Sequence, residues 1–596
     1  MKKISSPVIR EIKYSEKDLS KFEDIICKEE DTNKKILLNY PTVYIINDKN
    51  NNEKFSVYIG ETADIKRRTI QHLNIDPKKR VEWKKLSTSD TSKMLVIGHD
   101  HFNKSLTLDI ENRLMLYLSS ADKVDSLYNR RMNEQNEYYT SNELDSIFSK
   151  VWTGLRKINK DLFPIERIIK DSAIFKASPF HKLTDEQIRA KDFILLRIME
   201  ALTREKTGQL ILVAGEAGSG KTVLMSSLFY ELSQLEQDGD ENIIYKDLSS
   251  FLLVNHDQQL KVYQQISNKL GITSKKKSNL VSKPTTFINN HSPEEPVDVV
   301  IVDEAHLLWT QGKQAYRGKN QLYDLLERAK VVVAVFDPNQ VLTTEQFWEA
   351  EELAKLQHEA IQNNNYILLT NQLRINSDKQ TVEWIRLLID EQKINVIPQD
   401  KKGYDLQIFD SPDELHKAIK EKAKNQNAGI SRVIATFDWD YVSKKKPKNE
   451  DYWNVKINDW SLPWNLQLPQ TKEQKIKNRN LSWAEQEQTI DEVGSTFTIQ
   501  GFDLNYAGVI IGPSVKYRNN KIIFDRDGSR NKKATQKRKL KDNSKEYFSD
   551  TLLKNELNVL LTRGVNGLYI YAVDEELQQA LVNAKKEMSE NKNESN

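Results

Sequence analysis

The stretch Leu210-Ile-Leu-Val-Ala-Gly-Glu-Ala-Gly-Ser-Gly-Lys-Thr222 decides the fold of most of this chain. An aliphatic run ends in a glycine-rich loop, and helix-forming residues follow from Val223 to Leu232. Glycine lets such a loop curl so that its backbone N–H groups face a phosphate. The stretch therefore predicts a strand, a phosphate-binding loop and a helix of an α/β domain.

Three glycines, a lysine and a threonine carry the chemistry of this loop. We expect Gly215, Gly218 and Gly220 to give the backbone its curvature. Lys221 would reach the β- and γ-phosphates of ATP, and Thr222 would hold Mg²⁺. The alternative, a glycine-rich turn followed by an exposed lysine, does not explain the order of strand, loop and helix.

A second segment supplies carboxylates. The aliphatic run Val299-Val-Ile-Val302 is followed by Asp303-Glu-Ala-His306. We expect Asp303 to bind Mg²⁺ through water and Glu304 to polarise the attacking water. An Asp-Glu pair after a strand also serves as a helix N-cap, but the phosphate-binding loop upstream favours the catalytic interpretation.

Short aliphatic runs alternate with amphipathic stretches over the C-terminal two-thirds of the chain. Buried parallel strands of layered α/β domains have this pattern. The predicted strands are Leu210–Ala214, Val297–Val302, Val331–Phe336, Tyr366–Leu369, Val433–Thr436, Val509–Ile511 and Leu568–Tyr571.

These segments resemble the motifs of superfamily 1 helicases, and more closely those of the Schlafen-type helicase domain, over residues 180–574. In Lys182-Leu-Thr-Asp-Glu-Gln187, Gln187 matches the glutamine that reads the adenine edge. In Asp337-Pro-Asn-Gln340, Gln340 matches a sensor residue near the γ-phosphate. The resemblance implies a first RecA-like lobe that binds ATP.

The same resemblance implies a second RecA-like lobe. Its opening motif is matched by Asn371-Gln-Leu-Arg374 and its last motif by Asn558-Val-Leu-Leu-Thr-Arg563. Arg374 and Arg563 would bring positive charge to the γ-phosphate when the lobes close, although either arginine alone could be a surface ion-pair partner. The segment Ser495-Thr-Phe-Thr-Ile-Gln-Gly-Phe-Asp503 is similar to the motif that links the nucleotide to nucleic acid.

The N-terminal part of the chain predicts a smaller α/β unit. The runs Thr42–Ile46 and Phe55–Gly60 have the pattern of strands, and the asparagine-rich segment Asn47–Lys54 joins them as a turn. In a hairpin of these strands, Tyr44 and Tyr58 lie on the same side of the sheet.

The next segment predicts a helix over Thr62–Leu73 that starts near Thr62 as its N-cap. Ile65, Arg68 and His72 fall on one face of this helix, at spacings of three and four residues. Tyrosine, arginine and histidine side chains would therefore converge.

A further predicted helix, Leu106–Leu118, carries Glu111 within its apolar stripe. An ionised carboxylate on a buried face is costly unless it is paired or binds a cation. Glu111 is therefore a candidate metal ligand. The alternative is a glutamate at the edge of the stripe that pairs with a lysine or arginine.

These residues resemble the motifs of GIY-YIG nucleases, which occur here in family order over residues 41–131 as Thr42-Val-Tyr44, Tyr58-Ile-Gly60, Arg68, His72, Glu111 and Asn129. By this resemblance, Glu111 would hold one Mg²⁺ or Mn²⁺ that acts as a Lewis acid on the scissile phosphate, and Arg68 would neutralise developing charge. Tyr44, Tyr58 or His72 would order or deprotonate the attacking water, and the choice stays open here. The sequence departs from the family at Thr42, which replaces the first glycine.

The composition is typical of a soluble protein of several domains. The 596 residues are 38% hydrophobic and 29% charged, and no apolar run approaches the roughly 18 residues of a membrane span. Residues 1–20 contain no secretory signal, so we expect a cytoplasmic location. The single cysteine, Cys27, cannot form an internal disulfide, and any metal would bind oxygen ligands.

The expected fold class is a multidomain α/β protein with a GIY-YIG-like nuclease domain followed by two RecA-like parallel-sheet lobes. The expected parts are an N-terminal extension (1–40), the nuclease domain (41–140), a helical linker (141–180), lobe 1 (181–360), lobe 2 with insertions (361–585) and a disordered tail (586–596). Residues 273–296 and 443–474 are expected to be insertions or surface loops.

Together the motifs predict an ATP-driven nucleic-acid motor joined to a metal-dependent endonuclease, with DNA favoured over RNA. By analogy with similar fusions, we expect a role in bacterial defence against phages. Two alternatives stay open: an ATP-switched sensor that binds nucleic acid without translocation, and a motor whose nuclease-like domain is inactive.

Two further features are candidates for nucleic-acid contacts. Between Lys516 and Lys545 there are twelve Lys or Arg residues against three Asp, which suits either a phosphate backbone or a disordered, solvated loop. Four tryptophans could stack on bases, although core packing is the commoner use of this residue. They are Trp439, Trp453, Trp460 and Trp464.

Overall fold

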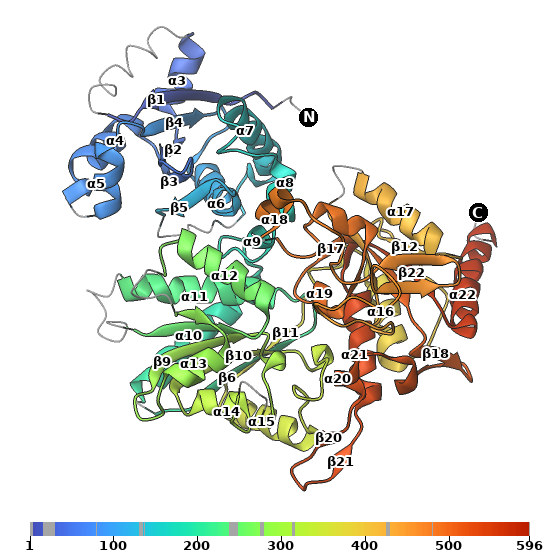
Figure 1. Ribbon diagram of the computed structural model, residues 1–596. Helices are drawn as coiled ribbons and strands as arrows, with labels where there is room; N and C mark the ends of the chain where they lie inside the picture. Colours follow the sequence, from blue (N-terminus) through green and yellow to red (C-terminus); the bar gives the residue numbers. More distant parts are fainter. Residues whose placement is uncertain are drawn as a thin grey trace. The chain divides into compact units, whose positions relative to one another are not determined.

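The computed structural model describes residues 4–15, 30–78, 80–129, 135, 137–204, 206–237, 248–273, 279–312, 316–424, 429–479 and 481–594. Cys27 lies outside these residues. The chain forms two compact units, each of which is described by itself (Figure 1). The first contains Met1–Thr184, Ser226–Asp247 and Val262–Val281, and the second contains Asp185–Met225, Leu248–Lys261 and Ser282–Asn596.

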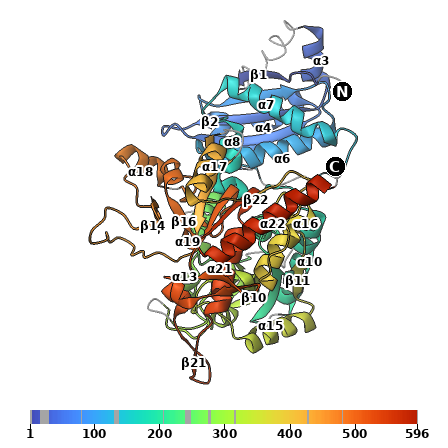
Figure 2. The ribbon, with the colours of Figure 1, turned by 90° about the vertical axis from the view of Figure 1, so that its right-hand side faces the viewer.

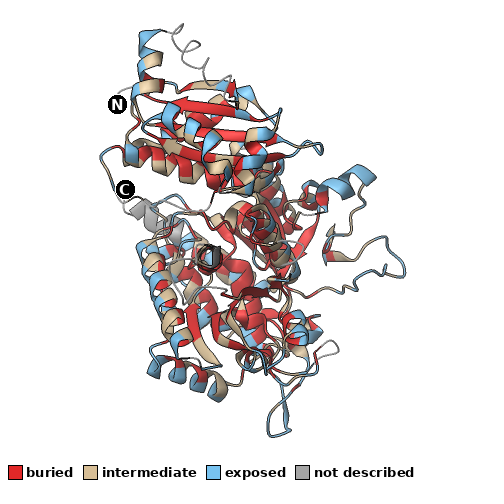
Figure 3. Ribbon diagram, turned by 90° about the vertical axis from the view of Figure 1, so that its left-hand side faces the viewer, coloured by how far each residue is buried: buried red, intermediate tan, exposed pale blue. Residues whose placement is uncertain are grey.

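The first unit is built on a mixed sheet of order β1-β4-β2-β3-β5. Its strands are β1 (Val8–Lys13), β2 (Thr42–Lys49), β3 (Phe55–Thr62), β4 (Lys93–Gly98) and β5 (Val124–Leu127). Strand β2 pairs antiparallel with β3 and β4, whereas β5 joins β3 in parallel. Most residues of β2, β3 and β4 are buried (Figure 3).

The sequence suggested that residues 1–40 are an extension. The described part of them instead packs with this sheet. Strand β1 pairs antiparallel with β4, and α3 (Asp31–Asn39) packs Ile36 and Leu37 into the same core. The alternating apolar residues Val8 and Ile12 explain why the strand forms.

The helices of the first unit differ in their limits from the predicted ones. They are α4 (Ile65–Asn74), α5 (Val81–Thr88), α6 (Lys104–Ser120), α7 (Leu144–Ile158), α8 (Glu166–Asp171) and α9 (Ala173–Lys176). Thr62 ends β3, and the N-cap of α4 is Asp64, whose side chain accepts the N–H of Arg67. Strand β2 continues through Asn47 to Lys49, so the turn to β3 is shorter than predicted.

The second unit contains two parallel sheets. The first has the order β11-β6-β10-β9-β7-β8 and contains the predicted strands of the phosphate-binding region. The strands are β6 (Gln209–Gly215), β7 (Ser250–Val254), β8 (Val281–Ser282), β9 (Val297–Asp303), β10 (Ala329–Phe336) and β11 (Tyr366–Leu369). Because β11 pairs with β6, this sheet extends past residue 360, where the sequence placed the end of lobe 1.

The second sheet has the order β12-β22-β17-β13-β16, and all its printed pairs are parallel. The strands are β12 (Asp405–Ile408), β13 (Ser431–Ala435), β16 (Val493–Ser495), β17 (Leu504–Ile511) and β22 (Gly564–Ala572). Helix α22 (Glu575–Glu594) follows β22 (Figure 2). The helix includes residues 586–594, for which the sequence suggested a disordered tail. Leu577 and Leu581 bury one face of its first turns.

Helices surround these two sheets (Figure 1). They are α10 (Asp185–Thr203), α11 (Lys221–Gln237), α12 (Asp257–Lys269), α13 (Pro284–Asn290), α14 (Gln321–Leu326), α15 (Ala350–Gln362), α16 (Lys379–Arg386), α17 (Pro412–Lys424), α18 (Lys472–Asn478), α19 (Thr496–Ile499), α20 (Lys532–Thr535) and α21 (Ser549–Leu561). In the described part of the chain, no helix has both the length and the apolar character needed to cross a membrane.

The polar segment 443–474 of the second lobe, expected to be an insertion or surface loop, contains regular structure. Residues 443–474 contain the hairpin of β14 (Asn454–Ile457) and β15 (Trp460–Pro463), and Trp464 is fully buried beside it. Trp439, Trp453 and Trp460 pack against the same core, so core packing accounts for these tryptophans.

The basic block of residues 516–545 is ordered as well, which excludes the disordered loop. It forms the hairpins β18 (Val515–Arg518) with β19 (Lys521–Phe524), and β20 (Arg538–Lys539) with β21 (Lys545–Glu546).

Candidate active sites

The glycine-rich loop lies between β6 and α11, as the sequence predicts. Gly218 and Gly220 have φ angles of +91° and +76°, which side chains other than glycine rarely adopt. The ammonium group of Lys221 donates to the carbonyls of Gly215 and Glu216 at 2.6 and 2.7 Å. Lys221 is therefore held inside the curl of the loop.

A chain of polar contacts leads from Lys221 to the second sheet. Asp337 Oδ2 lies 3.5 Å from Lys221 Nζ and accepts a hydrogen bond of 2.6 Å from Gln340 Nε2. The Oε1 atom of Gln340 accepts from Arg563 Nη2 at 3.3 Å. The loop, the sensor segment after β10 and the last motif of the second lobe therefore meet.

Arg374 completes this cluster. Its Nε lies 2.6 Å from Asp503 Oδ1, and Arg563 Nη1 lies 3.9 Å from the same oxygen. A Cβ atom at Gly218 would stand 2.7 Å from that of Arg374, so the arginine lies directly on the phosphate-binding loop. Burial, with Arg374 nearby, lowers the pKa of Arg563 to about 10, so the guanidinium stays charged at neutral pH.

Two acidic residues lie at the end of β9, with Asp303 as its last residue and Glu304 directly after it. Asp303 is buried and accepts from Gln259 Nε2 at 2.8 Å. Glu304 has the left-handed backbone angles φ 52° and ψ 48°, a strained conformation that is common at functional sites. Burial favours its protonated form, but His306, Lys221 and Arg563 outweigh that effect and lower its pKa. Glu304 is therefore ionised.

Gln187 also touches the phosphate-binding loop. Its Nε2 donates to the carbonyl of Gly220 at 3.2 Å, and a Cβ at Gly220 would stand 2.1 Å from that nitrogen. Glycine at position 220 is thus needed for space as well as for its φ angle. The structure brings Gln187 to the loop from α10.

In the first unit, the predicted residues of the β2–β3 hairpin and α4 form an aromatic cluster. The rings of Tyr44 and Tyr58 are 6.2 Å apart, on the same side of the sheet. Tyr44 Oη lies 2.7 Å from His72 Nε2, and His72 Nδ1 lies 2.5 Å from Asp76 Oδ2. Trp83 stacks on the His72 ring at 3.8 Å.

These contacts fix the tautomer of His72. Burial and the charge of Arg68 lower the pKa of His72, which keeps the ring neutral near pH 7. A neutral ring donates from one nitrogen only. Because Asp76 can only accept when ionised, Nδ1 donates to it and Nε2 accepts the Tyr44 hydroxyl proton.

Gly60 makes room for this cluster. A Cβ atom at this position would stand 2.3 Å from Tyr44 Oη. Residues 44 and 60 are cross-strand partners in the β2–β3 ladder, so the tyrosine ring crosses over the glycine. The last glycine of Tyr58-Ile-Gly60 is therefore required by space.

Arg68 and Glu111 lie close to both tyrosines. Burial raises the pKa values of Tyr44 and Tyr58, whereas hydrogen bonds and charge from Arg68 lower them in part. Glu111 is 7% exposed, and burial, together with the charge of Glu61, raises its pKa to about 8. No hydrogen bond or ion pair joins Glu111 to another residue that the structure describes.

Asn129 holds the strand that carries Tyr58. Its amide oxygen accepts the N–H of Ile59 at 3.0 Å, and its amide nitrogen donates to the Ile59 carbonyl at 2.7 Å. The side chain thus occupies the place of a neighbouring strand. Asn129 is 6% exposed, and these contacts make it a positioning residue.

Comparison with known families agrees with this arrangement. Residues 208–574, more than half of the chain, match the family described as Schlafen group 3, DNA/RNA helicase domain. The chain belongs to the Schlafen group 3 helicase family. Residues 40–123 match the GIY-YIG catalytic domain, so this Schlafen-type helicase carries a nuclease-type domain at its N-terminal side.

A curated relative has been found in yeast. The uncharacterized protein YPL245W of Saccharomyces cerevisiae is 33% identical over 433 residues, which are 68% of this chain and 91% of the yeast protein. Its printed name indicates no activity.

The donor sets of both sites fit the groups that the two families use. Lys221 and the positive-φ glycines form a cradle for phosphates. In the nuclease-type domain, Glu111 is a buried carboxylate with no hydrogen-bond or ion-pair partner among the residues that the structure describes. Among the described residues, no group of three or more His, Cys, Asp or Glu could enclose a metal. One carboxylate completed by water and phosphate oxygens is a set that suits Mg²⁺.

Several contacts of the two sites were missed from the sequence. Asp76 and Trp83 hold His72, Gln259 holds Asp303, and Glu61 acts on Glu111. Only Asp76 has a local signal, because it follows His72 by four residues, although it lies in the short 3-10 helix after α4. The other contacts join segments that are distant along the chain.

Proposed function

We propose that this chain is an ATP-driven nucleic-acid motor whose N-terminal domain cuts phosphodiester bonds with one divalent metal ion. The observation that carries the ATPase half is the continuous contact chain Lys221–Asp337–Gln340–Arg563. It joins the phosphate-binding loop to the last motif of the second lobe. Helicase and nuclease domains together imply that nucleic acid is the partner.

In the ATPase, Lys221 would leave the loop carbonyls and bind the β- and γ-phosphates, and Thr222 and Asp303 would hold Mg²⁺. Ionised Glu304 orients the attacking water. Arg374 and Arg563 stabilise the charge that develops on the γ-phosphate. Since Arg563 contacts Gln340, loss of the γ-phosphate changes a contact between the lobes, which is the step that moves or switches a helicase.

In the nuclease, Tyr44 is the residue best placed to accept a proton from water. As it takes that proton, Tyr44 passes its own hydroxyl proton to His72 Nε2, and the Asp76 carboxylate stabilises the resulting imidazolium. Arg68 offsets negative charge on the phosphate. Burial raises the pKa of Tyr44, so this two-proton relay avoids a free tyrosinate.

Glu111 is proposed to hold the metal, which would supply Lewis-acid activation of the scissile phosphate. Support comes from its burial, its lack of a partner among the described residues and its raised pKa. Binding of a cation would release the proton from Glu111. DNA is favoured as the substrate by the resemblance to GIY-YIG nucleases.

One experiment tests both halves. The full-length protein is incubated with plasmid, single-stranded DNA and RNA, with Mg²⁺ and with or without ATP, and cleavage and phosphate release are measured. Glu111→Ala should abolish cleavage and leave ATP hydrolysis intact, whereas Lys221→Ala should abolish hydrolysis.

The outcomes separate the alternatives. Hydrolysis that nucleic acid does not stimulate would favour an ATP-switched sensor over a motor. If both the wild type and Glu111→Ala cleave, Glu111 is not a residue of the nuclease site. If the wild type does not cleave, the nuclease-like domain is inactive. A role in antiviral defence has no support from the yeast relative, and it is not part of the proposal.

A further inference from the structure

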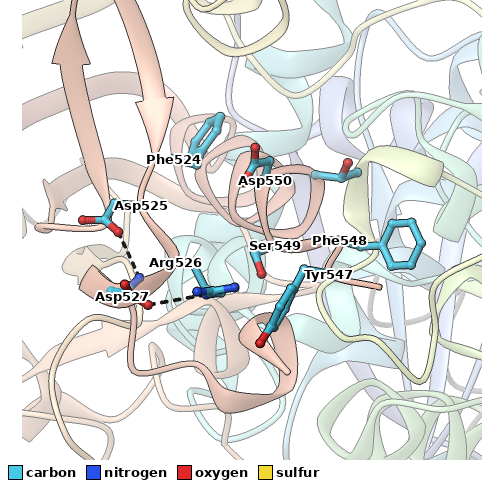
Figure 4. Close-up of a pocket in the computed structure, with 9 residues that line it drawn as sticks. Phe524, Asp525, Arg526, Asp527, Tyr547, Phe548, Ser549 and Asp550 are labelled. Carbon is cyan, nitrogen blue, oxygen red and sulfur yellow. Dashed lines mark hydrogen bonds and ion pairs between the residues drawn. The ribbon is translucent and has the colours of Figure 1, made fainter. Parts of the chain in front are cut away.

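An exposed tyrosine in the second lobe has two cations close to its ring. Tyr547 is 47% exposed, and the guanidinium of Arg526 stands 4.1 Å from the centroid of its ring. The ammonium group of Lys537 stands 5.1 Å from the same centroid. Arg526 and Tyr547 approach one another at a pocket of about 440 Å³ (Figure 4). We call these three residues the tyrosine platform.

The platform is rigidly supported from behind. Phe548, the next residue, points away from Arg526 (Figure 4) and stacks on Phe347 at 4.2 Å. Both phenylalanines pack against a core cluster that includes Leu552 and Leu553 of α21. An aromatic residue that only filled space would be buried in such a cluster, whereas Tyr547 is held at its edge with its ring open to solvent.

Unneutralised positive charge surrounds the platform. Five exposed lysines of the surrounding segments make no ion pair with a carboxylate of the described residues. They are Lys532, Lys533, Lys537, Lys539 and Lys545. The β20–β21 hairpin, which carries two of them, projects from the lobe (Figures 1 and 2). Lysines that lack carboxylate partners are available to phosphate groups.

The pocket itself does not suit a phosphate. Asp525, Asp527 and Asp550 line it. Asp525 pairs with Lys516 at 2.6 Å, and Asp527 pairs with Arg526 at 3.4 Å. Carboxylates repel phosphate groups but accept hydrogen bonds from the amino groups of nucleobases. The arrangement therefore separates the two parts of a nucleotide, with the base at the pocket and the phosphates along the lysines.

We infer that the tyrosine platform binds single-stranded nucleic acid by stacking a base on Tyr547 and Arg526. Flat aromatic and guanidinium faces combined with a row of cations are the means by which proteins bind single strands without sequence preference. In a duplex the faces of the bases are covered by stacking, so the platform selects unpaired bases. The inference rests on the proposed function, for which it supplies the strand-binding site.

Helix α21 connects this platform to the ATP site. The helix begins at Ser549, two residues after Tyr547, and Arg563 follows its end. On the way, Asn555 Nδ2 donates to the carbonyls of Pro338 and Val341 at 3.1 and 2.9 Å, which ties the helix to the sensor segment. A strand bound at one end of α21 would therefore influence the residues that meet the γ-phosphate.

The test measures binding of the full-length protein to a fluorescent 20-nucleotide single strand, without Mg²⁺ or ATP. Tyr547→Ala should weaken binding about tenfold, and Tyr547→Phe should keep wild-type affinity because it keeps the ring. An abasic strand should bind wild type and Tyr547→Ala equally. Lys537→Gln should instead reduce the slope of log affinity against log salt concentration by about one.

Controls separate stacking from general damage. Tyr139 is 85% exposed and has no cation over its ring among the described residues, so Tyr139→Ala should bind like the wild type. The thermal unfolding transition of Tyr547→Ala should match that of Tyr547→Phe, which reports correct folding. DNA and RNA strands of one sequence, and a duplex, distinguish the kind of nucleic acid.

Three results would overturn the inference. Equal binding of the single strand by wild type and Tyr547→Ala would refute stacking on Tyr547 but would not contradict the proposed function. A wild-type protein that binds no nucleic acid of any kind would refute both the inference and the proposed function. Stronger binding of the duplex than of the single strand would also contradict a site for unpaired bases.

Discussion

Replacing Glu111 by glutamine should stabilise the nuclease-type domain at alkaline pH even though it removes the proposed metal ligand. Burial and the charge of Glu61 raise the pKa of Glu111 to about 8 in the folded protein. In the unfolded chain the same carboxyl ionises near pH 4.5. Between these pH values the folded state binds a proton that the unfolded state has lost, so stability falls as pH rises.

The size of this effect follows from the two pKa values. A rise of this extent corresponds to a loss of folding stability of at most about 5 kcal/mol. The loss is absent below pH 4.5 and reaches its full size above pH 8. Glutamine has nearly the same shape and no charge to desolvate. The advantage of Glu111→Gln should therefore grow from zero in acid to its maximum near pH 8.

Hydrogen–deuterium exchange of peptides from α6 in the full-length protein measures this advantage locally. With EDTA present, exchange at pH 8.5 should be slower in Glu111→Gln than in the wild type, by up to about 10³-fold, and the two should converge at pH 5. Adding Mn²⁺ at pH 8.5 should slow exchange in the wild type alone, because only an ionised carboxylate gains from the cation.

The exposed residue Glu53 of the same unit gives a matched control, and Glu53→Gln should change nothing at either pH. Equal exchange of Glu111→Gln and the wild type at pH 8.5 would refute the claim that an unpaired, buried carboxylate destabilises α6. A protective effect of Mn²⁺ in Glu111→Gln would show that the metal binds elsewhere.

Three further substitutions test the geometry of the two sites. Gly60→Ala should lower cleavage about 10²-fold with ATP hydrolysis unchanged, because the new methyl group displaces Tyr44; normal cleavage would contradict the steric argument. Asp76→Asn should lower the cleavage rate about 10²-fold with little change in substrate binding, since the imidazolium of His72 loses its carboxylate, and an unchanged rate would exclude the relay. Arg374→Ala should lower kcat for ATP by at least about 10³-fold while binding of a fluorescent nucleotide persists, and a loss of nucleotide binding alone would assign Arg374 to binding.

The sequence predicts the elements of the helicase region well because a single local pattern defines each one. The strand, loop and helix around Lys221 are formed by consecutive residues. The aliphatic runs that predict β9 and β10 are buried on both faces, as in parallel sheets. Lobe limits were less predictable. The run Tyr366–Leu369 looks like any other buried strand, and only its pairing with β6 assigns it to the first sheet.

Sequence patterns do not predict which residues contact the predicted site residues. Asp337 lies more than a hundred residues from Lys221, and its contact depends on β10 lying beside β6. Gln259 reaches Asp303 from α12 in the same way. Contacts of this kind follow from sheet order, which aliphatic runs do not encode.

Thr42 shows why the departure from the GIY-YIG pattern leaves the nuclease site intact. Thr42 is buried opposite Thr62, at the far end of the ladder from the turn, and its hydroxyl donates to the Thr62 carbonyl at 3.5 Å. Gly60 lies two pairs further along and directly faces Tyr44. The two glycines of the family pattern therefore differ in their physical demand. Position 42 requires only an extended backbone, which threonine favours, whereas position 60 must leave space for the Tyr44 ring. A chain with a residue other than glycine at the second position would be expected to lose cleavage, and one with threonine at the first would not.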